Sequence, residues 1–327
     1  MRYIEFPPGA ESRLLPFYLS VEEYVARKYD DDCFFIWQVD PTVIVGRNQL
    51  IAKEVDEEYC RRQGIHIFRR KSGGGCVYSD RGGLMLSFVV SEDNAATAFV
   101  KCMTLLRDAL CSMGIAATLS GRNDVMIGDG KVAGAAFYRS AGKSIMHTTL
   151  LYDTDLDLLS RPITPSAEKL EGRGVESVRK RVDNVGRHTS MTMDEFRGYI
   201  RQRLCGDEAI RLSEMEVSDI SVMEREMVTR DFIYGHNPKY SVHRKRYIDG
   251  VGEVEAFIDV KKGRIHNINL LGDYFLLGDL DNDLLRRLRG VELTREAITG
   301  ALADVSLSDV IRGMDKQQLM ELLLNRI

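Results

Sequence analysis

The densest group of residues with chemical potential is a run of cations followed by glycines, residues 69–77 (RRKSGGGCV). Because glycine lacks a Cβ, backbone N–H groups in such a run can approach a ligand closely and φ can be positive. The adjacent Arg and Lys side chains favour an anion, and the guanidinium fork suits a phosphate group. The run matches neither GxxxxGK[ST] nor GxGxxG. It predicts an anion-binding loop, with a solvated turn between two strands as the alternative.

A second group surrounds Lys131, in residues 121–124 (GRND) and 128–134 (GDGKVAG). A lysine among glycines can meet a carboxylate and a phosphate together, because its ammonium is a compact charge with three donors. Asp124 could accept a hydrogen bond from an adenine amine or hold a magnesium ion. Taken alone, this group is better explained as a hairpin turn with a solvated lysine.

Histidine and cysteine supply no further catalytic arrangement in the sequence. Residues 147–151 (HTTLL) place one His on a predicted strand, and the six His give no Ser/His/Asp set or metal-ligand spacing. The six Cys contain no CxxC pair, so buried thiols are expected. Cys76 could be suspected as an acyl-carrying nucleophile, but a small apolar residue lining the loop is the preferred interpretation.

The elements that must position these residues alternate between helices and strands up to about residue 240. A helix is predicted over residues 17–28, with Glu22, Glu23 and Arg27 opposite its apolar face, and another over residues 95–113. Short β-rich runs are predicted as strands at residues 34–37, 42–45, 65–68, 84–90, 131–138 and 145–152.

The pattern changes after about residue 235, where residues 236–238 (HNP) indicate a break. Alternation over residues 254–260, a turn at Lys262-Gly263 and residues 264–271 predict a β-hairpin, and helix-like segments follow. We therefore predict a large mixed α/β domain at residues 1–240 and a smaller α+β domain at residues 241–327.

Composition agrees with two domains and excludes several classes of protein. The chain has 327 residues, of which 44% are hydrophobic and 29% charged, so at least one large core is possible. Its 45 Lys and Arg against 49 Asp and Glu give a net charge of −4, too acidic overall for nucleic acid or an anionic membrane as a default partner. No leader pattern and no long apolar run appear, so a cytoplasmic protein is expected.

The order of the motifs makes them specific as a set. Together they resemble the lipoate–protein ligase family over nearly the whole chain, including the small accessory domain of its bacterial members. The motifs are residues 17–23 (FYLSVEE), 46–49 (GRNQ), 69–77, 121–124 with Lys131, 147–151, 174–182 (GVESVRKRV) and 234–238 (YGHNP).

This resemblance implies a mixed-sheet catalytic domain of the biotin/lipoate ligase type and an ATP-dependent activity. Free lipoate would react with ATP to give lipoyl-AMP, and the lipoyl group would pass to one lysine of a lipoyl carrier domain. The carriers would belong to 2-oxoacid dehydrogenase complexes or be the glycine-cleavage H protein. Magnesium would accompany ATP without a permanent metal site, and a monomer is expected. Such chemistry needs charge neutralisation and no enzyme nucleophile.

The resemblance also assigns roles to individual residues. Lys131 would bridge the lipoate carboxylate and the α-phosphate and is the expected catalytic residue. Asp124 would lie near the adenosine or its magnesium, and Arg70 would bind ATP phosphates. The expected nucleotide contacts are Arg70, Ser72, Gly73, Gly74, Gly75, Cys76, Val77, Tyr78, Asp124 and Lys131. The expected lipoate contacts are Arg47, Gly75, Lys131, Gly134 and His147.

Departures from the family pattern leave alternatives open. The family often has His-His-Gly-Thr where this chain has residues 146–149 (MHTT), which puts the size of the acyl pocket, and the choice of lipoate or octanoate, in question. An ATP-independent octanoyl or lipoyl transferase would need a cysteine after residues 147–151, and none occurs between Cys111 and Cys205. A non-catalytic lipoate or nucleotide sensor, in which Met146 and Thr148 would mark a degraded pocket, is a further alternative. Biotin ligation is disfavoured because the Gly-Arg-Gly-Arg run of biotin ligases is missing.

The resemblance implies, finally, a C-terminal domain that moves during the reaction, with a hinge near residues 235–241. The basic residues 243–246 (HRKR) could help to dock an acidic carrier domain, with a solvated basic strand as the alternative.

Overall fold

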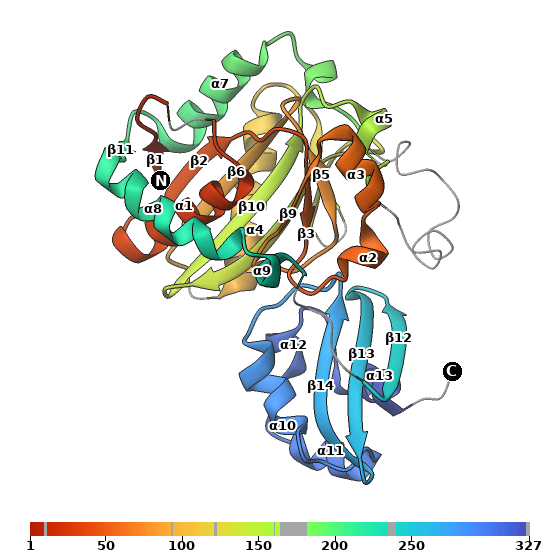
Figure 1. The fold of residues 1–327 in the computed structure, drawn as a ribbon. Coiled ribbons are helices and arrows are strands. Elements are labelled where there is room, and N and C mark those ends of the chain that lie inside the picture. Colours follow the sequence, from red (N-terminus) through yellow and green to blue (C-terminus); the bar gives the residue numbers. More distant parts are fainter. Residues whose placement is uncertain are drawn as a thin grey trace.

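The computed structural model describes residues 1–9, 12–92, 94–120, 123–159, 161–163, 182–234 and 240–324. Figure 1 shows a larger N-terminal part built around one extended sheet and a smaller C-terminal part attached below it. The predicted combination of a large mixed-sheet domain with a smaller α+β domain is therefore confirmed. No helix among the described residues is both long and apolar enough to cross a membrane.

The large sheet has eight strands in the order β11-β1-β2-β6-β10-β9-β8-β7. The pairs β1–β2 and β1–β11 are parallel, and the other pairs are antiparallel. Central strands β2 and β6 are buried along their whole length, which is why they appear in sequence as continuous apolar runs. The strands are β1 (Arg2–Glu5), β2 (Cys33–Trp37), β6 (Gly83–Val90), β7 (Ala117–Ser120), β8 (Asp124–Ile127), β9 (Gly130–Ser140), β10 (Lys143–Leu151) and β11 (Ala209–Arg211).

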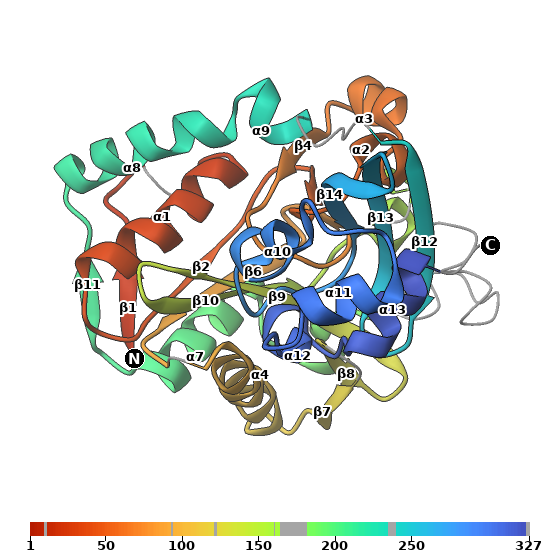
Figure 2. The same cartoon turned by 90° about the horizontal axis from the view of Figure 1, so that it is seen from below.

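Helices cover both faces of this sheet, and Figure 2 shows the two layers edge-on. Helices α4 (Ala95–Cys111) and α7 (Met193–Cys205) lie on one face, and α1 (Leu15–Lys28) and α8 (Glu214–Met227) lie on the other. The helix predicted over residues 95–113 thus ends at Cys111, and Gly114 turns the chain with φ 83°. Two hydrophobic cores result, one on each face.

The charged face predicted for helix 17–28 is wrong. In α1 the side chains of Glu22 and Glu23 are 0% and 3% exposed. Helix α8 packs along α1, so α1 is enclosed between α8 and the sheet. A buried carboxylate requires hydrogen-bonding partners, and both glutamates have them.

A second, three-stranded sheet has the order β4-β3-β5. Strand β3 (Thr42–Val45) pairs in parallel with β4 (His66–Arg69) and antiparallel with β5 (Val77–Ser79). Because β3 lies between its two neighbours, the segment between β4 and β5 has to cross the end of β3. This segment, residues 70–76, contains the glycine run, and its position is thereby fixed beside the turn that follows β3.

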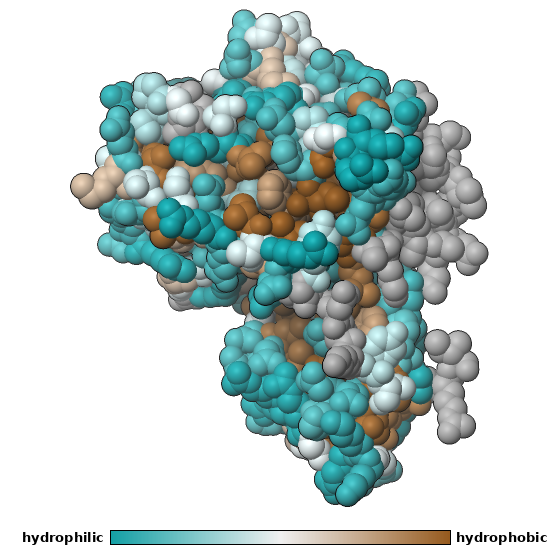
Figure 3. Space-filling model, viewed as in Figure 1, coloured by the Kyte–Doolittle hydropathy of each residue, from teal (hydrophilic) through white to brown (hydrophobic). Residues whose placement is uncertain are grey.

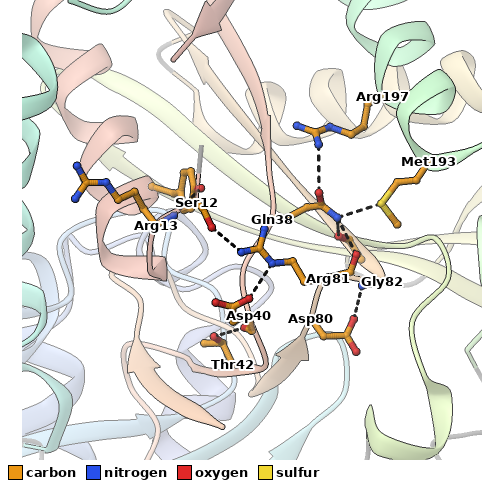
Figure 4. Close-up of polar contacts among 12 residues, drawn as sticks. Ser12, Arg13, Gln38, Asp40, Thr42, Asp80, Arg81, Gly82, Met193 and Arg197 are labelled. Atoms are coloured by element: carbon orange, nitrogen blue, oxygen red, sulfur yellow. Dashed lines mark hydrogen bonds and ion pairs between the residues drawn. The ribbon is translucent and has the colours of Figure 1, made fainter. Parts of the chain in front are cut away.

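A polar group around Gln38 joins the end of β2 to α7 and to the turn before β6. Gln38, just after β2, donates to the carbonyls of Arg81 and Gly83, at 2.8 and 3.3 Å, and accepts from Arg197 of α7. Arg81 in turn is bonded to Asp40 (Figure 4). None of the predicted site residues belongs to this group, which joins β2, α7 and the turn before β6. The short helices are α2 (Ile51–Glu54), α3 (Glu57–Gln63), α5 (Leu156–Leu159), η2 (Val185–His188) and α9 (Arg230–Tyr234).

The C-terminal domain is built on an antiparallel sheet of β12 (Val242–Ile248), β13 (Gly252–Lys261) and β14 (Arg264–Gly272). The predicted hairpin is confirmed, since Lys262 and Gly263 adopt positive φ angles of 51° and 77° between β13 and β14. This sheet and the following helices enclose a third core. The helices are η3 (Leu280–Leu285), α10 (Arg286–Leu288), α11 (Arg295–Ala301), α12 (Leu307–Val310) and α13 (Lys316–Leu324).

The C-terminal domain touches the N-terminal part at the glycine run. Gly74 N–H donates to the Tyr274 carbonyl at 2.9 Å, and Gly272 N–H donates to the Asn48 carbonyl at 2.8 Å. The ring of Phe275 stacks on Phe137 of β9 at 5.8 Å and belongs to the core on the α4 side of the large sheet. The segment after β14 therefore forms one wall of the region around residues 70–76.

Candidate active site

The Arg70 side chain shapes the glycine loop, as we call residues 70–76. Its guanidinium is buried, with 4% of the residue exposed. Nη2 donates to the carbonyls of Gly73 and Gly75, at 2.6 and 2.8 Å, and Nε donates to Ser72 Oγ at 3.0 Å. Burial lowers the pKa of Arg70 to about 10, which leaves the guanidinium protonated at neutral pH.

These bonds determine where the amides of the loop point. In a trans peptide the N–H points opposite to the preceding C=O. Arg70 draws the carbonyls of Gly73 and Gly75 toward itself, so the N–H groups of Gly74 and Cys76 are directed away from it. The bond from Gly74 N–H to Tyr274 shows this outward direction. The loop could therefore bind an anion through these amides if Gly74 N–H exchanged the Tyr274 carbonyl for it.

Close packing explains why this loop consists of glycines. Gly74 has φ 86°, and a Cβ there would lie 2.8 Å from the Phe275 ring. A Cβ on Gly73 would lie 2.4 Å from the Tyr274 carbonyl oxygen, and one on Gly46 would lie 2.0 Å from the Gly74 carbonyl oxygen. Side chains at these positions would force the loop and its two neighbouring segments apart.

The other two cations of the run have different partners. Arg69 is 2% exposed and donates to the carbonyls of Gly46 and Gln49, both at 2.8 Å, which fixes the turn after β3. Lys71 pairs with Glu23 of α1 at 2.8 Å. The sequence-based expectation was a set of cations presented to a ligand. Both arginines instead donate within the protein, Arg69 to backbone carbonyls and Arg70 to backbone carbonyls and Ser72 Oγ. A direct contact of Arg70 with ATP phosphates stays a prediction.

Lys131 lies in a more open environment. Its ammonium is 2.7 Å from Asp124 Oδ1, and the two side chains are 34% and 30% exposed. Asp124 on β8 is the cross-strand partner of Gly134 on β9, and a Cβ at Gly134 would lie 2.7 Å from Lys131 Nζ. The structure therefore brings together Lys131, Asp124 and Gly134, which belong to one group in the sequence.

Strand register relates Lys131 to the glycine loop. Gly134 is two residues from Ala136, which pairs with His147 of β10. Residues two apart on a strand face the same side and are about 7 Å apart. The Lys131 ammonium, which lies over Gly134, is therefore on the same sheet face as His147. His147 in turn contacts Ser72 of the glycine loop, with 2.7 Å between Nε2 and Oγ.

The family-pattern departures in β10 lie on the opposite face. Met146 belongs to the core on the α4 side, and Thr148, fully buried, is paired with Leu86 and Ala135 of that same core. The substitutions thus leave the His147 face unchanged. Of the residues in the 174–182 motif, only Val182 is described, and it bridges to Lys131. Residues 121, 122 and 235–239, which include most of the predicted hinge, lie outside the described residues.

The remaining predicted residues are distributed around the loop. Arg47 is exposed on the turn after β3, and its N–H donates to the Ser72 carbonyl at 2.9 Å. Cys76 and Val77 are half-buried against the core on the α1 side. Tyr78 is buried in that core, where burial together with Asp80 raises its pKa. Tyr78 is therefore part of the support of the loop.

One residue of the site was missed by sequence reasoning. Glu22 of α1 lies 3.2 Å from His147 Nδ1, so Ser72, His147 and Glu22 form a Ser/His/acid series that the sequence did not reveal. The signals were a pair of adjacent acids in a largely apolar helix and the place of residues 17–23 in the set of motifs. Within the described part of the chain, no three His, Cys, Asp or Glu side chains are grouped as a metal site.

The family models that match this chain cover both domains. The lipoyl protein ligase A/B catalytic domain matches residues 16–205, and the bacterial lipoate protein ligase C-terminus matches residues 237–323. Lipoate-protein ligase LplJ of Bacillus subtilis is 31% identical over 320 residues, which cover 93% of this chain and 95% of that protein.

Solved structures of similar fold agree with these matches. Plasmodium falciparum LipL1 in complex with lipoate aligns over 98% of this chain and 97% of its own, with a TM-score of 0.74 and 20% identity. A bipartite ligase from Thermoplasma acidophilum, described with its E2 lipoyl domain, aligns over 74% and 98% with a TM-score of 0.62 and 28% identity. A lipoate-protein ligase A bound with ATP aligns over 72% and 98% with a TM-score of 0.60 and 26% identity. The chain belongs to the lipoate–protein ligase family.

Proposed function

We propose that this protein activates free lipoate with ATP, giving lipoyl-AMP and pyrophosphate, and then transfers the lipoyl group to a lysine of a lipoyl carrier domain. The observation that carries the proposal is the pairing of a partly exposed ammonium, Lys131, with a loop of outward-facing amides on one sheet face. Family membership and the ATP- and lipoate-bound relatives support the choice of substrates.

Adenylation joins two anions, and charge neutralisation is therefore its main requirement. The lipoate carboxylate has to approach the α-phosphate of ATP against electrostatic repulsion. A positioned ammonium removes this repulsion and stabilises the charge that develops in the transition state. We assign this role to Lys131, which would exchange Asp124 for the substrates, and we assign to Asp124 the magnesium ion that arrives with ATP.

The glycine loop would hold the nucleotide phosphates through backbone N–H groups, with Gly74 giving up its bond to the Tyr274 carbonyl. Arg70 would contribute its charge from beneath the loop and keep Gly73, Gly74 and Gly75 in shape. The same nucleotide site would be supported or bordered by Ser72, Cys76, Val77 and Tyr78.

An apolar surface is available for the acyl chain. Figure 3 shows apolar side chains gathered on the N-terminal domain between α8 on one side and α2 and α3 on the other. The half-buried side chains of Cys76, Val77 and Tyr138 pack against the core on the α1 side of the large sheet. We propose that Arg47, Gly134 and His147 border the acyl chain, whose burial would contribute about 0.8 kcal/mol per CH₂.

The division into a catalytic domain at residues 1–240 and an accessory domain at residues 241–327 is part of the proposal. The start of β12 at Val242 supports this boundary. The carrier domain of a 2-oxoacid dehydrogenase complex, or the H protein, is the proposed acceptor, and the protein is proposed to act as a cytoplasmic monomer.

Mass spectrometry of candidate carriers tests this function. Each carrier would be incubated with the protein, ATP and magnesium, together with either lipoate or octanoate. A mass increase of one acyl group, absent without ATP and absent in a carrier whose target lysine is replaced by arginine, is the expected result. Acyl transfer from an acyl-carrier protein without ATP would indicate a transferase instead. Ligand binding without adenylate or carrier modification would indicate a sensor.

A further inference from the structure

A buried hydrogen-bonded series links helix α1 to the glycine loop. Glu22, His147 and Ser72 are 0%, 4% and 0% exposed. Both carboxylate oxygens of Glu22 lie 3.2 Å from His147 Nδ1, and His147 Nε2 lies 2.7 Å from Ser72 Oγ. Arg70 Nε continues the series to Ser72 Oγ at 3.0 Å. Four residues from α1, β10 and the loop are therefore joined without access to water.

The donors in this series point in one direction, from Arg70 through Ser72 and His147 to Glu22, because Arg70 can only donate. Arg70 can only donate, so Ser72 Oγ accepts from it, and the Ser72 hydroxyl hydrogen is left for His147 Nε2. His147 then carries its proton on Nδ1 and donates it to Glu22. A hydroxyl in a dry site needs an acceptor, and in this direction every donor has one.

Glu22 is held as an acceptor by further donors. Ser87 Oγ donates to Glu22 Oε1 at 2.5 Å, and Tyr138 Oη donates to Oε2 at 3.3 Å. Trp37 Nε1 donates to Ser87 Oγ at 2.9 Å, which leaves the Ser87 hydrogen for the carboxylate. Burial and the Glu22 carboxylate raise the pKa of Tyr138, so Tyr138 remains a donor. The protonation pattern of the series is thus fixed from the α1 side.

We propose that Glu22 and His147 are positioning residues for the nucleotide. By accepting the Ser72 hydrogen, His147 fixes the rotation of the hydroxyl group, so that its hydrogen points away from Arg70 and its lone pairs face the Arg70 donor. Arg70 then holds the carbonyls of Gly73 and Gly75, and the loop amides face outward toward the nucleotide phosphates. The inference rests on the proposed role of the glycine loop in nucleotide binding.

The series has the connectivity of a Ser/His/acid triad without the access that a nucleophile needs. Ser72 is fully buried, and its Oγ already accepts from Arg70. Formation of lipoyl-AMP and its attack by a carrier lysine also require no acyl-enzyme. The same three side-chain types therefore set the geometry of a binding loop here, and no covalent step passes through them.

Replacing Glu22 by Gln tests the direction of the series. An amide donor facing His147 Nδ1 moves the imidazole proton to Nε2, as an Asp-to-Asn change does in a serine protease triad. Ser72 then faces a donor and loses its acceptor. Loss of a hydrogen bond in such a charged network corresponds to roughly 10- to 100-fold in an equilibrium. In lipoate-dependent pyrophosphate release, the KM for ATP of Glu22→Gln is expected to rise by about this factor, with kcat within a few-fold.

Spectroscopy distinguishes this effect from a general loss of structure. The ¹⁵N resonances of His147, assigned by their absence in His147→Gln, should show a protonated Nδ1 in the native protein and a protonated Nε2 in Glu22→Gln. Glu216→Gln is the matched control, because Glu216 is also a buried carboxylate that accepts from hydroxyl groups, at Tyr29 and Ser213. It is expected to lose stability and keep its KM for ATP.

A second pair of variants keeps the test decisive if Glu22→Gln does not fold. His147→Gln retains an acceptor that can reach Ser72, whereas His147→Leu does not. The KM for ATP should rise in His147→Leu and be largely restored in His147→Gln.

The outcomes separate two failures. An unchanged KM for ATP in both Glu22→Gln and His147→Leu, or an acyl adduct on Ser72 during turnover, would overturn the positioning role. An unchanged KM for ATP in Ser72→Ala would instead contradict the role of the glycine loop, and with it this part of the proposed function. If the KM for ATP rose in Ser72→Ala and stayed unchanged in Glu22→Gln, Glu22 would not be a positioning residue. The role of the glycine loop in nucleotide binding would still stand.

Discussion

The two cationic regions of the site differ in burial more than in composition. Arg69 and Arg70 are 2% and 4% exposed, and their donors are bonded to backbone carbonyls. Lys131 is 34% exposed at its side chain and has one carboxylate partner, Asp124. Both regions look alike in sequence, since each places cations beside glycines. Burial assigns the arginines to shaping a loop and leaves the lysine able to exchange its partner for a substrate.

The side-chain types suit this division. A guanidinium has five donors in a rigid fork and can hold several carbonyls at once, and it stays protonated even when burial lowers its pKa to about 10. An ammonium on a flexible stem is a compact charge that can follow a reacting group. We therefore expect that a lysine in place of Arg70 would not hold the glycine loop, and that an arginine in place of Lys131 would not support adenylation.

Removal of the Lys131 ammonium is expected to have the largest effect. Lys131→Ala should lower lipoate-dependent pyrophosphate release by about 10²- to 10³-fold or more, because the approach of two anions loses its neutralising charge. The melting temperature should change little, since the Lys131–Asp124 pair is partly exposed. Lys101→Ala is the matched control, because Lys101 is also a partly exposed lysine near an aspartate, 3.7 Å from Asp32. Near-normal release by Lys131→Ala would end its assignment as the catalytic residue.

A change of Arg70 to Lys should affect stability and ATP binding together. The ammonium cannot hold Ser72 and the carbonyls of Gly73 and Gly75 at once, so buried acceptors lose their donor. Unfolding in urea should show a loss of about 2–4 kcal/mol, and the KM for ATP should rise. An Arg70→Lys protein that kept native stability and lost kcat as Lys131→Ala does would contradict the assignment of Arg70 to shaping the loop.

A smaller effect is expected from alanine at Gly74. Gly74 and Gly142 have similar positive φ angles, 86° and 78°, but a Cβ would meet the Phe275 ring only at Gly74. Gly142→Ala should therefore cost only the backbone strain, about 1–2 kcal/mol, and leave the KM for ATP unchanged. Gly74→Ala should cost more and also raise that KM. Removal of the ring in Gly74→Ala with Phe275→Ala should recover part of the loss, whereas equal effects of the two single alanines would show that the contact with Phe275 is unimportant.

Local patterns predicted much of this fold and part of the site. The alternation in residues 254–271 was sufficient for the hairpin, and the glycines around Lys131 marked a real cluster with Asp124. These features depend on residues that are close in sequence. The change of pattern after about residue 235 indicated two domains, and the order of motifs along the chain added the family.

The features that sequence reasoning did not show depend on partners distant in sequence. Glu22 looked solvated because no local pattern showed that it would face Ser87 of β6 and His147 of β10, which lie 65 and 125 residues later in the chain. The donors of Arg70 looked available because nothing local showed that the chain would fold its own carbonyls around them. The contact of Gly74 with Tyr274 and Phe275 belongs to the same class, since it joins two domains.

A crystal structure of the protein with a non-hydrolysable lipoyl-adenylate analogue would test the central claim most directly. We expect Lys131 Nζ to leave Asp124 and to lie within hydrogen-bonding distance of both the acyl oxygen and the phosphate. We expect Arg70 to keep its bonds to Gly73 and Gly75, with loop amides facing the phosphate. A phosphate held by the Arg70 guanidinium, with Lys131 still paired to Asp124, would contradict the division of roles between the two regions.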